Sequence, residues 1–305
     1  MDNFDKVLLY YNPKAGNGVI SARLDRIVER FQRKRLQLIP VRADKRDFLD
    51  KFFQSVDGNS YRKILAAGGD GTINTMVNAM VKHDIHTPLG ILPAGTANDL
   101  AWYFDIPQSI DDALDIILSD RYTEMDVGLA NGKAFANVLA MGMVVDVSQK
   151  TDPNVKNTLG VMAYYLRSMA EIPKLRPIPI KVTSDGMDIE TDMYAMLVMN
   201  GKSAGGFKSI SPESEINDGL FDVYIFESAN ITNWGPLFIS LLTGNHADNK
   251  SVVYFRASKL KIESETVISA DVDGETAESP PLDISLLPKR LRICTLTNNM
   301  SGNIW

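Results

Sequence analysis

One stretch of the sequence places a carboxylate among glycines directly after an apolar run. Residues 63–67 read as a buried strand, and they lead into Gly68, Gly69, Asp70, Gly71 and Thr72. Glycines can take a positive φ and let a ligand approach the backbone closely, because they have no Cβ. A helical pattern begins at Ile73, so the unpaired N–H groups of the helix start would suit an anion such as phosphate.

The aspartate in this turn favours a functional loop over an ordinary strand-to-helix turn, which glycines alone would equally fit. A carboxylate beside phosphate groups is unfavourable unless a metal ion or a substrate hydroxyl is bound there. The turn is not a Walker A loop, because no Gly-Lys-Ser/Thr follows it.

Two further polar loops follow short apolar runs. The run 7–11 ends in Asn12, Pro13, Lys14, Ala15 and Gly16, and the run 89–93 is followed by Gly95, Thr96, Asn98 and Asp99. Asparagine, proline and glycine fill many ordinary turns, and Asn or Asp is a common helix N-cap. Ligands gather at the carboxyl ends of strands in parallel sheets, so the three loops can converge on one site.

Residues 68–72 resemble the signature of the diacylglycerol kinase catalytic-domain family, and residues 95–99 resemble its second signature. The resemblance implies an α/β nucleotide-binding domain with a parallel-rich sheet, similar to those of NAD kinases and phosphofructokinases. It also implies that ATP lies along the three loops, and that Asp70 takes part in catalysis.

Two acidic turns in the second half of the chain match the same family. In the first, at 211–222, the resemblance implies an accessory Mg²⁺ held by Asp218, with oxygens near Glu215 and Leu220. In the second, at 271–275, it places a general base, with Glu275 as the first candidate and Asp273 as the second. An ordinary hairpin turn is the alternative for both. We prefer Glu275 because an aspartate at such a position often caps its own turn.

The alternation of strands and helices changes at about residue 124. Before it, strand–helix units predict a parallel sheet covered by helices. After it, short alternating runs and the turns Asn131-Gly132 and Asp185-Gly186 predict an antiparallel β-rich sandwich. We therefore expect an α/β domain at 1–124 and a β-rich domain at 125–288. The resemblance implies that the first domain binds ATP, that a strand within 289–305 returns to it, and that the second domain binds the acceptor lipid. Two helices are expected in the second domain, at 159–169 and 231–242.

The composition is that of a folded globular protein, with 45% hydrophobic and 23% charged residues among 305. A net charge of −6 argues against a general nucleic-acid binder, and the single Cys294 excludes an internal disulfide. We expect a cytoplasmic protein, because no signal peptide and no membrane-spanning run is found. A basic region, made of Arg23, Arg26, Arg30, Arg33, Lys34, Arg35, Arg42, Lys45 and Arg46, reads as a solvated helix face or as a contact to anionic membrane.

The resemblance implies an ATP- and Mg²⁺-dependent lipid kinase that phosphorylates the hydroxyl of diacylglycerol or a related lipid at the inner face of a membrane. Kinases for sphingosine-like lipids, other glycerolipids or NAD are alternatives, and so is a non-catalytic nucleotide or lipid sensor. A homodimer is an open alternative to a monomer.

Overall fold

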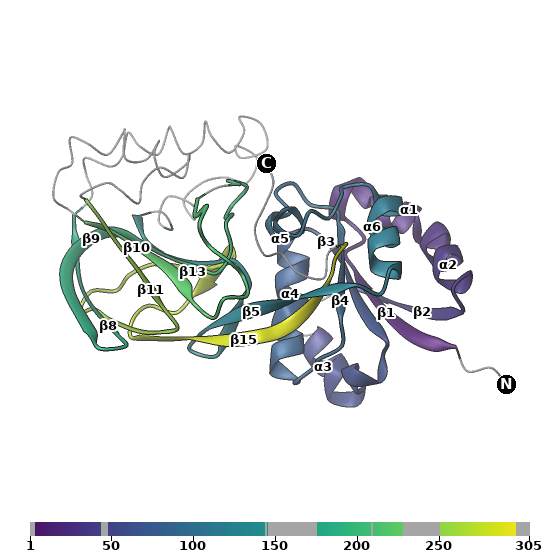
Figure 1. The fold of residues 1–305 in the computed structure, drawn as a ribbon, viewed down its shortest axis with the longest axis horizontal. Helices are drawn as coiled ribbons and strands as arrows, with labels where there is room; N and C mark the ends of the chain where they lie inside the picture. The colour runs from purple at the N-terminus through teal and green to yellow at the C-terminus, as the bar shows by residue number, and fades with distance from the viewer. Residues whose placement is uncertain are drawn as a thin grey trace. The chain divides into compact units, whose positions relative to one another are not determined.

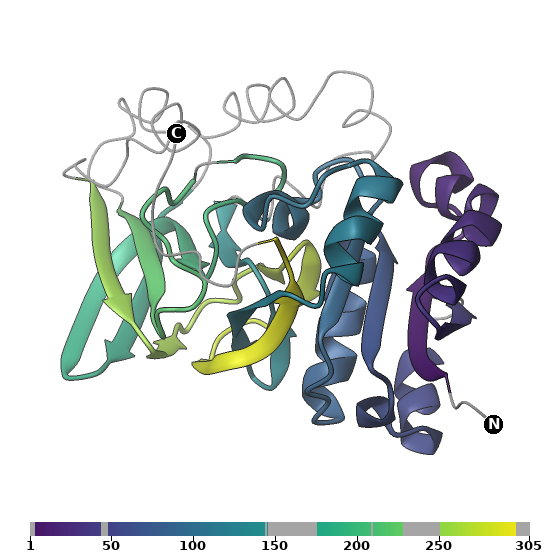
Figure 2. The same ribbon diagram turned by 45° about the vertical axis from the view of Figure 1, so that its right-hand side comes forward.

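The computed structural model describes residues 4–43, 48–143, 145, 176–208, 210–227 and 251–296 (Figures 1 and 2). The chain forms two compact units. One consists of Met1–Val127 with Leu287–Trp305, and the other of Gly128–Leu286. The first is an α/β unit and the second is a β sandwich.

The first unit is built on a parallel sheet in the order β15-β4-β3-β1-β2. Its strands are β1 (Asp5–Tyr11), β2 (Leu36–Arg42), β3 (Lys63–Gly68), β4 (Leu89–Pro93) and the end of β15 (Leu282–Cys294). Strands β3 and β4 are buried along their whole length, and β1 is buried at residues 7–10, because helices cover both faces of the sheet. The three strands that carry the candidate loops are therefore neighbours that point in one direction.

The helices of this unit lie on the two faces of that sheet, with α2 against α6 and α3 against α4 (Figure 1). Their bounds are η1 (Ala15–Gly18), α1 (Val19–Ala22), α2 (Leu24–Gln32), α3 (Phe48–Ser55), η2 (Gly58–Ser60), α4 (Asp70–Lys82), α5 (Asp99–Tyr103) and α6 (Ile110–Leu118). The helical pattern of apolar residues through 20–31 is divided between α1 and α2 at Arg23, where the backbone leaves helical conformation. Helix α4 begins at Asp70, three residues before its apolar pattern becomes visible in the sequence.

Two cationic side chains from strands hold the carboxyl ends of helices. Arg290 of β15 donates to the carbonyl oxygens of Met80 and Ile85, at the end of α4, with both distances 3.0 Å. The buried Lys63 of β3 donates to the Ile117 carbonyl at the end of α6. Carbonyl groups of a last helical turn lack intrahelical donors and carry partial negative charge, so these contacts stabilise both helices against the sheet.

The strands of the second unit pair in antiparallel orientation. Its strands are the end of β5 (Tyr122–Ala130), β6 (Lys133–Phe135), β7 (Val138–Gly142), β8 (Ile178–Ser184), β9 (Met187–Met199), β10 (Phe221–Glu227), β11 (Val252–Ala257), β12 (Lys259–Glu263), β13 (Ala270–Val272), β14 (Glu275–Ala277) and the start of β15. Both expected hairpins are confirmed, because Asn131-Gly132 joins β5 to β6 and Asp185-Gly186 joins β8 to β9. Positive φ at Asn131 and at both glycines explains these residue types.

The central strands of this unit are buried on both faces. Along β10, Phe221, Val223 and Ile225 enter one apolar cluster, whereas Tyr224 and Phe226 enter another. This alternation places polar side chains of β10 on the same face as the second cluster.

Several expected elements have other bounds. The alternating run at 133–139 forms two strands, separated at Ala136 and Asn137, and of the run at 267–271 only the last two residues lie in β13. Strands β11 and β14 and the first half of β15 were not expected. The helices expected at 159–169 and 231–242 lie outside the described residues.

Candidate functional site

Three loops meet at the carboxyl edge of β1, β3 and β4. The Asn12 N–H donates to the Ala67 carbonyl at 2.9 Å, and the Ala94 N–H donates to the Gly68 carbonyl at 2.8 Å. The structure thus brings together the three segments that the sequence predicted to converge. Their exposed positions are Lys14, Gly16, Gly71, Gly95 and Thr96.

Different neighbours leave little room for a side chain at most of the glycines of these loops. Gly69 and Gly95 pack against each other, so a Cβ on Gly95 would lie 2.5 Å from the Gly69 Cα. A Cβ on Gly68 would lie 2.3 Å from the Thr72 hydroxyl. Gly16 has φ +54 and would bring a Cβ to 3.0 Å from the Ala94 carbonyl. Most of these glycines therefore permit one loop to touch another.

The expectation of positive φ at Gly68, Gly69 and Gly71 was wrong, since none of them lies in that region. The reason is that α4 begins at Asp70, so Gly71 is helical and Gly69 is its extended N-cap. Gly71 is also the position where an added Cβ would meet nothing within 4 Å. It faces open space at the start of the helix.

The carboxylate of Asp70 joins two of the loops. Its Oδ1 accepts the Asp99 N–H at 2.7 Å and its Oδ2 accepts the Asn98 N–H at 2.9 Å. These are N–H groups at the start of α5, where a negative charge is favourable. Asp70 is therefore a structural link between the loops, a role that the sequence did not predict.

Asn98 fixes the shape of the loop 95–99. Its side chain accepts the Gly95 N–H at 2.9 Å and donates to the Gly95 carbonyl at 2.8 Å and to the Gln108 side chain at 3.1 Å. Its backbone is left-handed, with φ 50. Asn tolerates this conformation better than most residues, which explains Asn at this position.

The first loop is held by Asn12, whose side chain accepts the Lys14 N–H at 3.0 Å. Lys14 is exposed, and Pro13 and Ala15 complete the turn into η1. Left-handed backbone continues through Gly16, Asn17 and Gly18. The loop therefore presents a cation beside the neighbouring loops without burying it.

In the second unit, Asp273 is bound by the backbone of a neighbouring segment. Its carboxylate accepts the N–H groups of Ala136, Asn137 and Val138 at 2.6, 2.9 and 2.9 Å. Burial raises the pKa of Asp273 to about 6, and the three hydrogen bonds oppose that rise. This contact also explains the break between β6 and β7, since these N–H groups are used outside the sheet.

The assumption that Asp273 caps its own turn was wrong. The turn is closed by Asp271, whose carboxylate accepts the Gly274 N–H at 2.7 Å. Glu275 opens β14 opposite Val272 and is partly buried. Its main-chain carbonyl accepts a hydrogen bond from Lys133 at 3.4 Å.

The candidate metal ligands lie in the loop before β10, where the side chain of Asp218 is held by other groups of the protein. Asp218 accepts the Leu220 N–H at 3.0 Å and forms an ion pair with Arg256 of β11. Glu215 lies three residues before it, between turns. No group of three or more His, Cys, Asp or Glu placed to hold a metal exists in the part of the chain that the structure describes. The structure therefore places a cationic side chain against the carboxylate for which the resemblance implied Mg²⁺.

Sequence reasoning missed three partners of the candidate residues. Arg256 pairs with Asp218, Lys133 donates to the Glu275 carbonyl, and Gln108 accepts from the Asn98 side chain. Arg256 and Tyr254 belong to a strand that was not expected, and Arg256 pairs in register with Asp222. The alternating pattern at 252–257 was the available signal for that strand, but the register was not visible in it.

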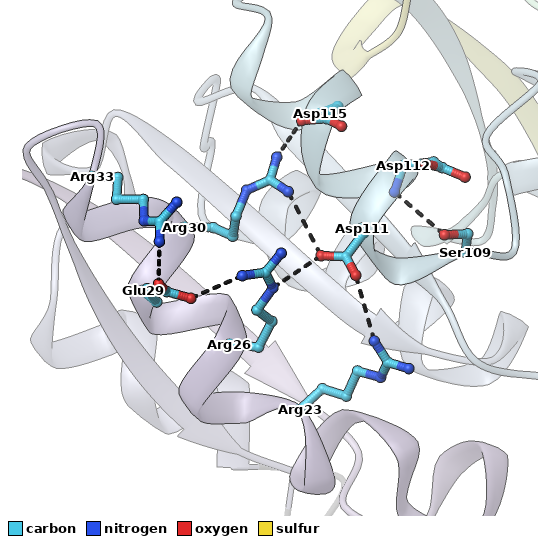
Figure 3. A network of polar contacts seen from close by, with 9 residues as sticks. All are labelled: Arg23, Arg26, Glu29, Arg30, Arg33, Ser109, Asp111, Asp112 and Asp115. Carbon is cyan, nitrogen blue, oxygen red and sulfur yellow. Dashed lines mark hydrogen bonds and ion pairs between the residues drawn. The ribbon is translucent and has the colours of Figure 1, made fainter.

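Four arginines of the basic region are paired with carboxylates. Arg23, Arg26 and Arg30 of the α1–α2 segment pair with Asp111 of α6 at 3.4, 3.3 and 3.6 Å, and Arg30 also pairs with Asp115 (Figure 3). Arg33 pairs with Glu29 at 2.5 Å. These contacts join α2 to α6. Lys45 and Arg46 lie outside the described residues.

Comparisons with known proteins find similarity to diacylglycerol kinases along almost the whole chain. Residues 6–130 match the family model described as diacylglycerol kinase catalytic domain, and residues 137–295 match the YegS C-terminal NAD kinase beta sandwich-like domain. A diacylglycerol kinase of Staphylococcus haemolyticus is 28% identical over 94% of this chain and 87% of its own length. One from Bacillus subtilis is 29% identical over 88% of each chain. A crystal structure of a diacylglycerol kinase from Bacillus anthracis superposes with a TM-score of 0.81, at 28% identity over 97% of this chain and 98% of that one.

Proposed function

Because the chain belongs to the diacylglycerol kinase catalytic-domain family, and is thus a phosphotransferase acting on a lipid hydroxyl, we propose that it uses ATP and Mg²⁺ to phosphorylate diacylglycerol. The observation that carries the proposal is the contact of the three loops: Asp70 and the Gly69–Gly95 pair join the loops 68–72 and 95–99, and Gly16 packs the loop 12–16 against Ala94. Such a joined set of turns offers backbone N–H groups and one lysine to a polyphosphate.

ATP would lie along these loops, with the start of α4 facing its phosphates. Gly69 caps this helix without a side-chain hydrogen bond. The Thr72 N–H donates to the Gly69 carbonyl at 2.9 Å. The N–H groups that precede it in a first helical turn have no intrahelical acceptor, so phosphate oxygens can accept from them. Lys14 and Thr96, both exposed, would supply a charge and a hydroxyl.

We propose Asp273 as the general base for the acceptor hydroxyl, with Glu275 as the alternative. A base works best when its pKa lies near the operating pH, and the Asp273 pKa of about 6 meets that condition. Its three backbone donors also fix the direction of the carboxylate. The base would take the hydroxyl proton while the hydroxyl oxygen attacks the γ-phosphorus and ADP leaves.

Asp218, with main-chain oxygens near Glu215 and Leu220, would hold the accessory Mg²⁺. The donor set consists of hard oxygens, and the orphaned carboxylate oxygen of the nearby Asp222 adds another, so the residues fit this ion. Mg²⁺ bound with the nucleotide supplies neutralisation of phosphate charge.

A screen of acceptors tests the proposed activity. Labelled ATP would be offered with diacylglycerol, a sphingosine-like lipid or a monoacylglycerol in mixed micelles, and with NAD in solution. Transfer of label to diacylglycerol is expected. Preferred transfer to another acceptor would change the substrate, and ATP binding without transfer to any of them would favour a nucleotide sensor.

Substitution of Gly71 by alanine should separate nucleotide binding from folding. The position is helical and has open space around it, so alanine should stabilise the free protein by up to about 1 kcal/mol. If phosphate approaches the backbone there, ATP affinity should nevertheless fall at least about tenfold, as measured by calorimetry.

The matched variant is Gly69→Ala, whose Cβ would lie 3.1 Å from the Gly95 Cα. It should lower both stability and ATP affinity, because it separates two loops. A larger Gly69→Val change should do so more strongly. Unchanged ATP affinity in Gly71→Ala would remove the start of α4 from the nucleotide site.

Peripheral binding to an anionic membrane is part of the proposed function. No helix among the described residues is long and apolar enough to cross a membrane. Since the arginines of α2 are paired, the other described cations of the basic region are Lys34, Arg35 and Arg42, and all three are exposed.

Lys34→Glu with Arg35→Glu should weaken binding to vesicles that contain anionic lipid. Each basic residue near such a surface contributes about 1 kcal/mol, so affinity should fall more than about tenfold. The control is Lys181→Glu with Lys259→Glu, which makes the same charge change on the sandwich. Equal sedimentation of both double variants with vesicles would show that the α2 region has no special role.

A further inference from the structure

A buried carboxylate in the sandwich has one oxygen without a hydrogen-bond donor. Asp222 lies in β10 with 1% of its surface exposed. Its Oδ1 accepts the Tyr254 hydroxyl at 2.6 Å, and the Arg256 Nε lies 3.6 Å from the same oxygen. No partner is found for Oδ2 anywhere in the described chain. A buried carboxylate oxygen without a donor is costly, which indicates that a further cation or donor belongs there.

Arg256 connects this carboxylate to a second one. Its Nη2 pairs with Oδ2 of Asp218, the proposed Mg²⁺ ligand. One guanidinium therefore serves two carboxylates, and the group keeps a net charge of −1. The Arg256 side chain is 39% exposed, whereas those of Asp218 and Asp222 are 20% and 1% exposed. The cation is thus the member that solvent can most readily release.

The two carboxylates stand on backbone that is held in place. The Ser211 and Tyr224 hydroxyls lie 2.7 Å apart, and Ser214 donates to Ser211 at 2.5 Å, which ties the segment before Asp218 to β10. The Tyr224 and Tyr254 rings stack at 5.1 Å, which ties β10 to β11. The carboxylates can therefore stay in place when Arg256 moves.

We propose that Arg256 is an internal counter-ion that a divalent cation displaces, and that Asp222 is a ligand of that cation together with Asp218. This rests on the accessory Mg²⁺ site of the proposed function, and it adds one ligand and one competitor to it. Exchange of Arg256 for a divalent ion brings the charge of the two carboxylates to zero and places the ion beside the Asp222 carboxylate, which has one oxygen without a donor. Mg²⁺ keeps several waters when bound, so two carboxylates are a sufficient protein contribution.

The test uses Mn²⁺ without nucleotide, because Mn²⁺ takes similar oxygen ligands and free Mn²⁺ can be counted by electron paramagnetic resonance. Only binding that Asp218→Asn removes is assigned to this site. Arg256→Gln should bind Mn²⁺ about tenfold more tightly than the natural chain, because a competing charge has gone. Asp222→Asn, which still accepts from Tyr254, should bind it about tenfold more weakly.

Lys261→Gln is the matched control, since it removes one partly exposed positive charge from the same unit at its ion pair with Glu263. Its Mn²⁺ affinity should equal that of the natural chain. The proposal is overturned if Arg256→Gln tightens binding no more than Lys261→Gln does, or if neither the natural chain nor Arg256→Gln binds Mn²⁺ at millimolar concentration. Transfer of phosphate from ATP is assayed separately, so the kinase assignment can fail or hold independently of this result.

Discussion

Asp273→Asn is expected to lower turnover by about 10²–10⁴-fold, the usual contribution of a positioned general base. In the natural enzyme, kcat/KM should rise with pH up to about 6 and then level off, because the base must be deprotonated and its pKa is raised to about 6. Glu275→Gln should reduce turnover much less. The measurements are initial rates with labelled ATP between pH 5 and 8.

Stability must be followed in the same experiments, since Asp273 also binds three backbone N–H groups. Its folded-state pKa lies above the ordinary value of 3.8. This group therefore makes the folded protein less stable as the pH rises from 3.8 to about 6, and adds no further change above that range. A rate profile without an inflection near pH 6, together with a large loss in Glu275→Gln, would move the role of base to Glu275.

Asp70→Ala is expected to lower both activity and stability. The substitution removes the acceptor of two N–H groups on buried residues, Asn98 and Asp99. Loss of these bonds should lower the free energy of unfolding by about 2–4 kcal/mol. Displacement of the loop 95–99 should reduce kcat/KM by about 10²-fold or more. Thermal unfolding without ligand and ATP turnover measure the two effects.

Asp70→Asn keeps one acceptor oxygen and should give an intermediate loss of stability. The control is Asp25→Ala, which removes an exposed carboxylate in the first turn of α2. A stable Asp70→Ala protein without activity would show that the carboxylate acts on the ligand alone. A protein with full activity would remove Asp70 from the mechanism.

The sequence by itself determined the features that depend on residues close to one another along the chain. Asn131-Gly132 and Asp185-Gly186 predicted two hairpins, because few residues tolerate the backbone of tight turns. Apolar runs followed by glycine loops predicted the strands β1, β3 and β4 and the edge at which their loops meet. The change from strand–helix units to alternating runs predicted an α/β unit followed by a β sandwich.

Only the tertiary structure decided what the aspartates contact. Asp70 binds residues 28 and 29 positions away, and Asp273 binds a segment more than 130 positions away. These contacts depend on which strands are neighbours and on their register, and a shift of one residue would turn the side chains to the other face. Arg256 reaches Asp218 for the same reason, since its strand pairs with β10 through a register that no local pattern contains.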